Sequence, residues 1–91
     1  MKPEVIIKDN IVVITYNNEF AIIERRIRDN GLQGITFSMP ITPKTADLLD
    51  KSGIVEVESF SESGVLTFRR KDFFETHLLI EVVMDILMNH R

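Results

Sequence analysis

The chain has 91 residues and a net charge of −3, with 44% hydrophobic residues, 27% charged residues, 4 glycines and 3 prolines. This balance describes one ordinary globular domain over residues 1–91 and excludes disordered, collagen-like and low-complexity chains. Cysteine is absent, which excludes a disulfide framework, a zinc ribbon and a thiol nucleophile. We therefore expect a cytoplasmic protein.

We expect neither an export signal nor a membrane-spanning segment. The apolar run Val5–Ile7 is too short for a signal peptide. The longest apolar tract, Leu78–Met88, is interrupted by Glu81 and Asp85 and is about half the length that spans a bilayer. We expect no membrane association.

The acidic excess lies in the middle of the chain. Residues 35–64 contain 2 Lys or Arg against 5 Asp or Glu, and the segments on either side are neutral. A chain without a broad positive field is poorly suited to nonspecific nucleic-acid binding, which makes nucleic acid an unlikely partner class.

The first predicted element is a β-hairpin. Val5–Lys8 and Ile11–Tyr16 are rich in β-branched residues, and Asp9-Asn10 between them tolerates the positive φ of a tight turn. The run Ile11–Ile14 is apolar without alternation, which predicts a central strand covered on both faces.

Residues 19–30 predict a short helix. Asn17-Asn18 offers an N-cap, and Gly31 supplies a left-handed stop. Three apolar residues share one helical face: Phe20, Ile23 and Ile27. The alternative is a third strand, because Ile22 lies off that face.

A strand–helix–strand unit follows. Apolar residues alternate from Ile35 to Met39, Thr42 and Pro43 are suited to the N-cap and first turn of a helix, and Gly53 is suited to its stop. The next strand begins at Ile54. If the two strands lie parallel in one sheet, the crossover is right-handed.

A second hairpin joins Ile54–Phe60 to Val65–Arg70 across residues 61–64. Its register follows from keeping apolar residues opposite one another and charges on the other face. The expected pairs are Phe60–Val65, Ser59–Leu66, Val57–Phe68 and Glu56–Arg69.

The last predicted element is the principal helix, over residues 72–90 with Asp72 as a possible N-cap. One narrow stripe is polar, formed by His77, Glu81, Asp85 and Asn89. Apolar residues occupy well over half of the circumference, more than one sheet can cover. The residues expected to remain for a partner are Ile80, Met84, Leu87 and Met88.

Together these elements predict an α+β fold, a single two-layer domain of order ββαβαββα. We expect a mixed sheet packed by helices, with the amphipathic C-terminal helix dominant.

Motifs for catalysis and metal binding are weak. His77, Glu81 and Asp85 have a spacing that can share a metal ion, but a solvent-facing stripe explains them equally well. The sequence has no phosphate-binding glycine loop, nucleophile elbow or zinc-protease motif. We expect no cofactor, no metal and no enzymatic activity.

The leading hypothesis is a small non-enzymatic interaction or regulatory module, acting as a homodimer through its C-terminal helix or as a small subunit of an assembly. One alternative is a nucleic-acid accessory protein using the basic clusters 25–28 and 69–71. Its key residues would be Arg25, Arg26, Arg69 and Arg70. A third is a ligand-binding or catalytic domain with its site near the helix that Thr42 begins.

Overall fold

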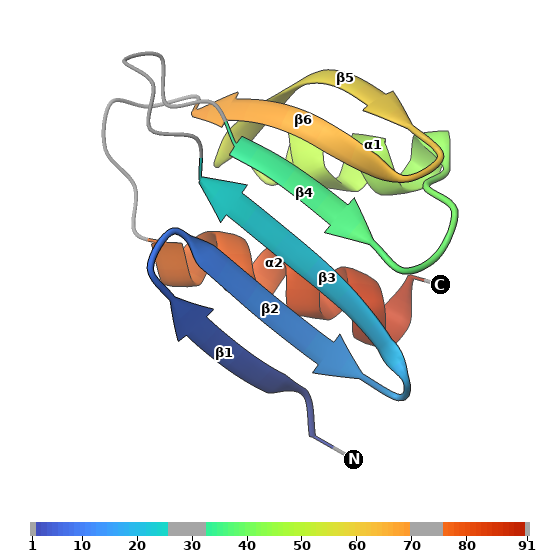
Figure 1. Ribbon diagram of the computed structural model, residues 1–91. Coiled ribbons are helices and arrows are strands. Elements are labelled where there is room, and N and C mark those ends of the chain that lie inside the picture. Colours follow the sequence, from blue (N-terminus) through green and yellow to red (C-terminus); the bar gives the residue numbers. More distant parts are fainter. Residues whose placement is uncertain (1, 26–32, 70–75, 91) are drawn as a thin grey trace.

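The computed structural model describes residues 2–25, 33–69 and 76–90, which form six strands and two helices. The strands are β1 (Glu4–Lys8), β2 (Ile11–Tyr16), β3 (Glu19–Arg25), β4 (Gln33–Phe37), β5 (Val55–Ser61) and β6 (Gly64–Arg69); the helices are α1 (Pro43–Lys51) and α2 (Thr76–Asn89). The strands form one sheet in the order β1-β2-β3-β4-β6-β5 (Figure 1). The α+β class is therefore confirmed.

The helix expected over residues 19–30 is wrong, because its first part is strand β3. Asn17 and Asn18 have φ angles of 52° and 66°. Positive φ at both central residues of a two-residue turn matches the twist of a hairpin, so the chain reverses here instead of capping a helix. Ala21 and Ile23 are buried on one face of β3, while Ile22 between them points to the other.

The observed element order is accordingly ββββαββα rather than ββαβαββα. Residues 26–30 and the expected helix stop at Gly31 lie outside the described residues. The same holds for the possible N-cap at Asp72, although the helix expected after it is present as α2.

The expected mixed sheet is also wrong, because every neighbouring pair of strands is antiparallel. Strand β6 lies between β4 and β5 and pairs with both. Because each of them is antiparallel to β6, β4 and β5 run in the same direction, and α1 connects them. The strand–helix–strand unit is thus present, with a third strand inserted into it.

Helix α1 has the ends that the sequence predicts. The Thr42 hydroxyl accepts a hydrogen bond from the Thr45 N–H at 3.3 Å, and Pro43 occupies the first turn. At the other end Gly53 has a φ of 78°, the left-handed conformation that glycine adopts without a steric penalty. The Ser52 hydroxyl completes this end by donating to the Leu49 carbonyl at 2.6 Å.

The β5–β6 hairpin keeps part of the expected register. The pairs Phe60–Val65 and Ser59–Leu66 are present. A bulge at Glu58 then shifts the register, so that Val57 pairs with Thr67 and Glu56 with Phe68. The bulge lets Val57 pack against the core while Glu58 stays exposed.

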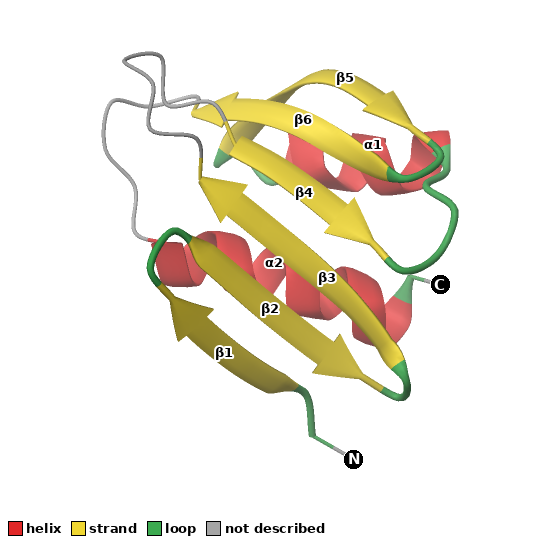
Figure 2. Ribbon diagram, viewed as in Figure 1, coloured by secondary structure: helices red, strands yellow, loops and turns green. Residues whose placement is uncertain are grey.

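Both helices lie on the same face of the sheet (Figures 1 and 2). Helix α1 packs against β5, and α2 packs against β2, β3 and α1. The core between the layers contains Val12, Ile14, Ala21, Ile23, Ile35, Phe37, Ile41, Leu49, Val55, Val65, Leu79, Ile80, Val83, Ile86 and Leu87.

Strand β2 is therefore covered on one face only. The sequence had suggested a strand covered on both faces, and that prediction is wrong. Val12 and Ile14 face the helices and are buried, whereas Ile11 is exposed on the opposite face and Val13 is partly exposed there. We call that opposite face the open face of the sheet.

The glycine that begins β6 provides a test of the sheet. A Cβ atom added to Gly64 would lie 2.6 Å from the Ile35 carbonyl oxygen and 3.3 Å from the Thr36 Cα. We expect Gly64→Ala to lower the free energy of unfolding by about 1–3 kcal/mol, because backbone atoms must move. The measurement is urea unfolding followed by circular dichroism.

The matched control is Gly34→Ala in β4, where an added Cβ meets no atom within 4 Å. We expect this variant to be as stable as the unmodified chain, or more stable by up to about 1 kcal/mol. Equal destabilisation by the two variants would contradict the β4–β6 pairing.

Candidate functional site

The four residues expected on an α2 interface divide into two pairs. Ile80 and Leu87 are buried in the core of the single chain. Met84 is partly buried against that core, and Met88 is 41% exposed. Much of the apolar face of α2 is therefore buried against the sheet. The apolar surface that α2 leaves exposed is smaller than its sequence implies.

The two methionines lie one turn apart on a single flank of α2. At 100° per residue, this flank is opposite the one that carries Val82 and Ile86. Val82 and Ile86 line the groove toward α1, and the sheet order places β1 on the other side of α2. The methionine flank therefore faces the β1 side of the molecule.

The polar stripe of α2 lies in solvent. His77, Glu81 and Asp85 are all exposed. The Asp85 carboxylate accepts a hydrogen bond from Asn89 Nδ2 at 2.8 Å and lies 3.2 Å from His90 Nε2. Within residues 2–25, 33–69 and 76–90, no three His, Cys, Asp or Glu side chains are grouped in a way that could hold a metal ion.

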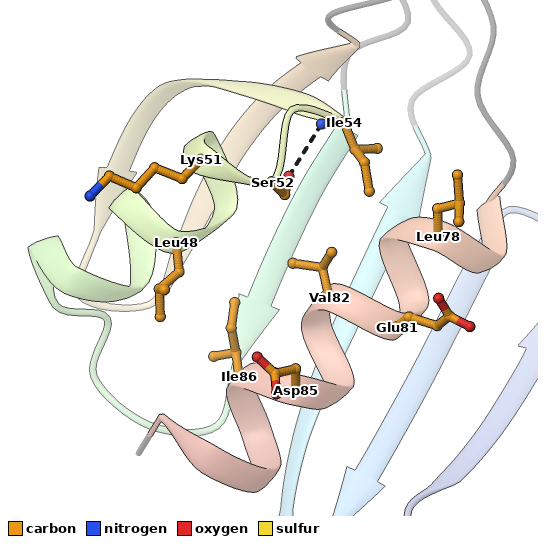
Figure 3. A pocket seen from close by; sticks show the side chains of 9 residues that line it. All are labelled: Leu48, Lys51, Ser52, Ile54, Leu78, Glu81, Val82, Asp85 and Ile86. Carbon is orange, nitrogen blue, oxygen red and sulfur yellow. Dashed lines mark hydrogen bonds between the residues drawn. The ribbon is translucent and has the colours of Figure 1, made fainter.

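A groove of about 420 Å³ separates α1 from α2 (Figure 3). Its lining is mainly apolar, with Leu48 from α1 and Val82 and Ile86 from α2. Lys51 points away from α2 in Figure 3 and forms an ion pair with Asp47 at 2.8 Å. That carboxylate raises the pKa of Lys51 through its hydrogen bond and its charge, so the lysine remains a cation held at the surface.

The hydroxyl that borders this groove has a structural role. Ser52 donates to the Leu49 carbonyl and accepts from the Ile54 N–H at 3.3 Å, as Figure 3 shows for the second bond. Both bonds tie down the end of α1. Among the described residues that line the groove, none is a histidine, so no imidazole base lies beside Ser52 there.

The polar groups at the start of α1, around Thr42, are hydrogen-bonded within the helix cap. The Thr42 hydroxyl accepts from the Thr45 N–H, and the Thr42 carbonyl accepts from the Ala46 N–H at 3.2 Å. These are the ordinary bonds of a helix N-terminus.

The first residue of each basic cluster, Arg25 and Arg69, lies at the same end of the sheet. Strands β3 and β6 run in the same direction because each is antiparallel to β4. The backbone of Arg25 therefore ends β3 at the end of the sheet where Arg69 ends β6. Arg26 and Arg70 lie outside the described residues.

The open face of the sheet carries more exposed apolar side chains than the methionine flank of α2. Register places Ile6, Val13 and Ile22 in one row across β1, β2 and β3. Ile6 is 57% exposed, Phe20 nearby on β3 is 39% exposed, and Val13 and Ile22 are partly exposed. Side chains opposite one another on one sheet face contact each other, so this row forms a continuous apolar surface.

Strand β1 is the most exposed part of this surface. All five of its residues are exposed, and among the described strands only β2 pairs with it. Val5 and Ile7 point to the helix side of the sheet, and Ile7 is 65% exposed because α2 stops short of β1. An apolar edge strand of this kind offers both side chains and unpaired backbone groups.

Sequence reasoning missed this surface. The signal is the alternation in β3, where Ala21 and Ile23 are buried and Phe20 and Ile22 are not. Apolar residues at both phases of a period-two pattern indicate two apolar faces, and only one of them is covered by helices.

Comparison with known proteins finds no matching family, no matching curated protein and no matching solved structure. In the part of the chain that the structure describes, neither helix is both long enough and apolar enough to cross a membrane.

A pair of α2 variants tests these placements. We expect Leu87→Ala to lower the free energy of unfolding by about 2–5 kcal/mol, because it opens a cavity in the core. Met88→Ala should change it by about 0.5 kcal/mol or less, because its side chain lies at the surface. Chemical denaturation of both variants at low protein concentration provides the measurement, and similar losses in both would contradict the burial of Leu87.

Proposed function

We propose that this chain is a non-enzymatic interaction module that self-associates through the β1 side of its sheet. The observation that carries the proposal is the exposed apolar surface of β1 and the neighbouring open face. Contiguous apolar surface on a small domain commonly marks a binding site.

The free energy available from burying these side chains is large enough to support self-association. Val5, Ile6 and Ile7 are 38–65% exposed, and burial of each would contribute about 1–2 kcal/mol. Two copies would contribute about 6–12 kcal/mol from these side chains, which is comparable with the association cost of about 4–15 kcal/mol. Hydrogen bonds and further sheet contacts would add to this.

The absence of an assembled reactive group in the described residues supports a role in binding. His77 and His90 lie at opposite ends of α2, and His90 lies beside the exposed Asp85. The Ser52 hydroxyl is used to end α1.

The interface that the sequence suggested on α2 is reduced here to Met84 and Met88, which border the same β1 side.

The test is sedimentation velocity over a range of protein concentrations. We expect the unmodified chain to form dimers and Ile6→Lys to be monomeric, because a charge would replace the centre of the apolar surface. The matched control is Leu78→Lys, on the opposite flank of α2 and 39% exposed, which should still dimerise.

A strictly monomeric unmodified chain would overturn the proposal. So would a dimer that tolerates Ile6→Lys and is dissociated by Met84→Glu and Met88→Glu, because that result would place the contact on α2 alone.

The ends of β3 and β6 lie at the same end of the sheet, on either side of β4, which favours nucleic-acid binding as a second candidate function. It would use the basic residues that end these strands, Arg25 and Arg69. We expect a salt-sensitive mobility shift with single-stranded or double-stranded nucleic acid that Arg25→Ala and Arg69→Ala together abolish. No shift at low salt, or a shift that survives both substitutions, would remove this candidate.

A further inference from the structure

Strand β1 presents a defined set of free backbone groups. Lys8 and Ile11 flank the two-residue turn Asp9-Asn10, and in such a turn the first residue accepts a hydrogen bond from the N–H of the residue three positions on. The backbone groups of Lys8 therefore point toward β2. By alternation those of Val5 and Ile7 point outward, away from the sheet.

These outward groups restrict how a second copy of β1 can pair with the first. In a symmetric antiparallel pair, the two-fold axis must pass beside Val5, Ile6 or Ile7, so that outward groups meet outward groups. An axis beside Val5 sets Lys8 opposite Lys2 of the second copy. An axis beside Ile7 sets Lys8 opposite Ile6 of the second copy.

The axis beside Ile6 gives a complementary arrangement. Glu4 then lies opposite Lys8 of the second copy, and by symmetry Lys8 lies opposite its Glu4. Val5 exchanges backbone hydrogen bonds with Ile7 of the second copy, and the two Ile6 side chains meet on the open face. Each charge thus meets the opposite charge and each apolar residue meets another apolar residue.

The other edge of the sheet lacks this complementarity. Strand β5 carries Glu56 and Glu58, both exposed, and contains no basic residue. A second copy of β5 would therefore meet acidic side chains without partners. The bulge between Val57 and Ser59 also interrupts its regular pairing, and both features are known to block edge association.

We propose that two copies of this chain join by antiparallel pairing of their β1 strands about Ile6, which merges two six-stranded sheets into one continuous sheet. The inference rests on the proposed function and names its partner and register. Pro3 has no N–H to donate, so Val5 is the first residue of β1 that exchanges hydrogen bonds with the second copy.

Charge exchange tests the register. Glu4→Lys places lysines opposite one another, and Lys8→Glu places glutamates opposite one another, at both symmetric contacts. We expect each single variant to weaken dimerisation about tenfold at low salt. The double variant Glu4→Lys with Lys8→Glu restores both contacts and should dimerise like the unmodified chain.

Mixing the two single variants gives a sharper result. A Glu4→Lys copy and a Lys8→Glu copy form opposite charges at both contacts, so we expect the mixed dimer to predominate in native mass spectrometry. The matched controls are Glu56→Lys and Lys2→Glu, which make the same changes of net charge at exposed positions outside the proposed pairs. Neither control should alter dimerisation.

Amide hydrogen exchange provides an independent readout. In a paired edge, the Val5 and Ile7 amides become hydrogen-bonded, so we expect their exchange to slow as protein concentration rises. The Ile6 amide points toward β2 and should change little.

The outcomes separate the two proposals. A chain that is monomeric at every concentration overturns the proposed function and this inference together. A dimer that Ile6→Lys dissociates, but that ignores charge exchange and leaves the Val5 and Ile7 amides unprotected, keeps the proposed function and overturns strand pairing. Restoration in the double variant and the mixed dimer supports the inference.

Discussion

The packing of α2 against the middle strands of the sheet is the interaction on which the rest of the molecule depends. Leu79, Val83 and Leu87 are buried between α2 and the sheet, together with core residues of β2 and β3 such as Ile14 and Ile23. This contact fixes which face of each strand is covered. Because β3 takes part in it, residues 19–25 gain more from pairing between β2 and β4 than from an isolated short helix, whose stability in water is marginal.

One-sided coverage has two consequences for the surface. The helices lie over β2, β3 and β5, so β1 extends beyond them and its apolar residues remain exposed on both faces. The open face has apolar residues of its own, because β2 and β3 are apolar at both phases of their alternation. The two sheet edges then differ in chemistry: β5 is acidic and bulged, while β1 is apolar between one acidic and one basic residue. The acidic excess of residues 35–64 thus includes Glu56 and Glu58, whose charges oppose pairing of a second copy at the β5 edge.

Local signals predicted the elements where a single residue type decides the conformation. Thr42 and Pro43 set the start of α1, Gly53 its end, and Asp9-Asn10 the first turn. The signals failed where two conformations satisfied the same residues. Asn17-Asn18 suits both a helix cap and a hairpin turn, and the apolar residues after it suit both periods. The bulge at Glu58 was also beyond local reasoning, because it depends on which face of β5 the helices cover.

The sequence by itself determined the class of the domain, the β1–β2 and β5–β6 hairpins, the limits of α1 and the presence of a strongly apolar C-terminal helix, because capping, turn chemistry and periodicity act over a few residues. Only the tertiary structure decided that β6 lies between β4 and β5. It also decided that much of the apolar face of α2 packs against the sheet of the same chain, and that the described helices leave the edge strand β1 exposed. Strand order and coverage depend on contacts between residues far apart in the chain. A sequence pattern shows that a side chain needs cover, but the folded chain determines whether it receives it from its own sheet or leaves it to a partner.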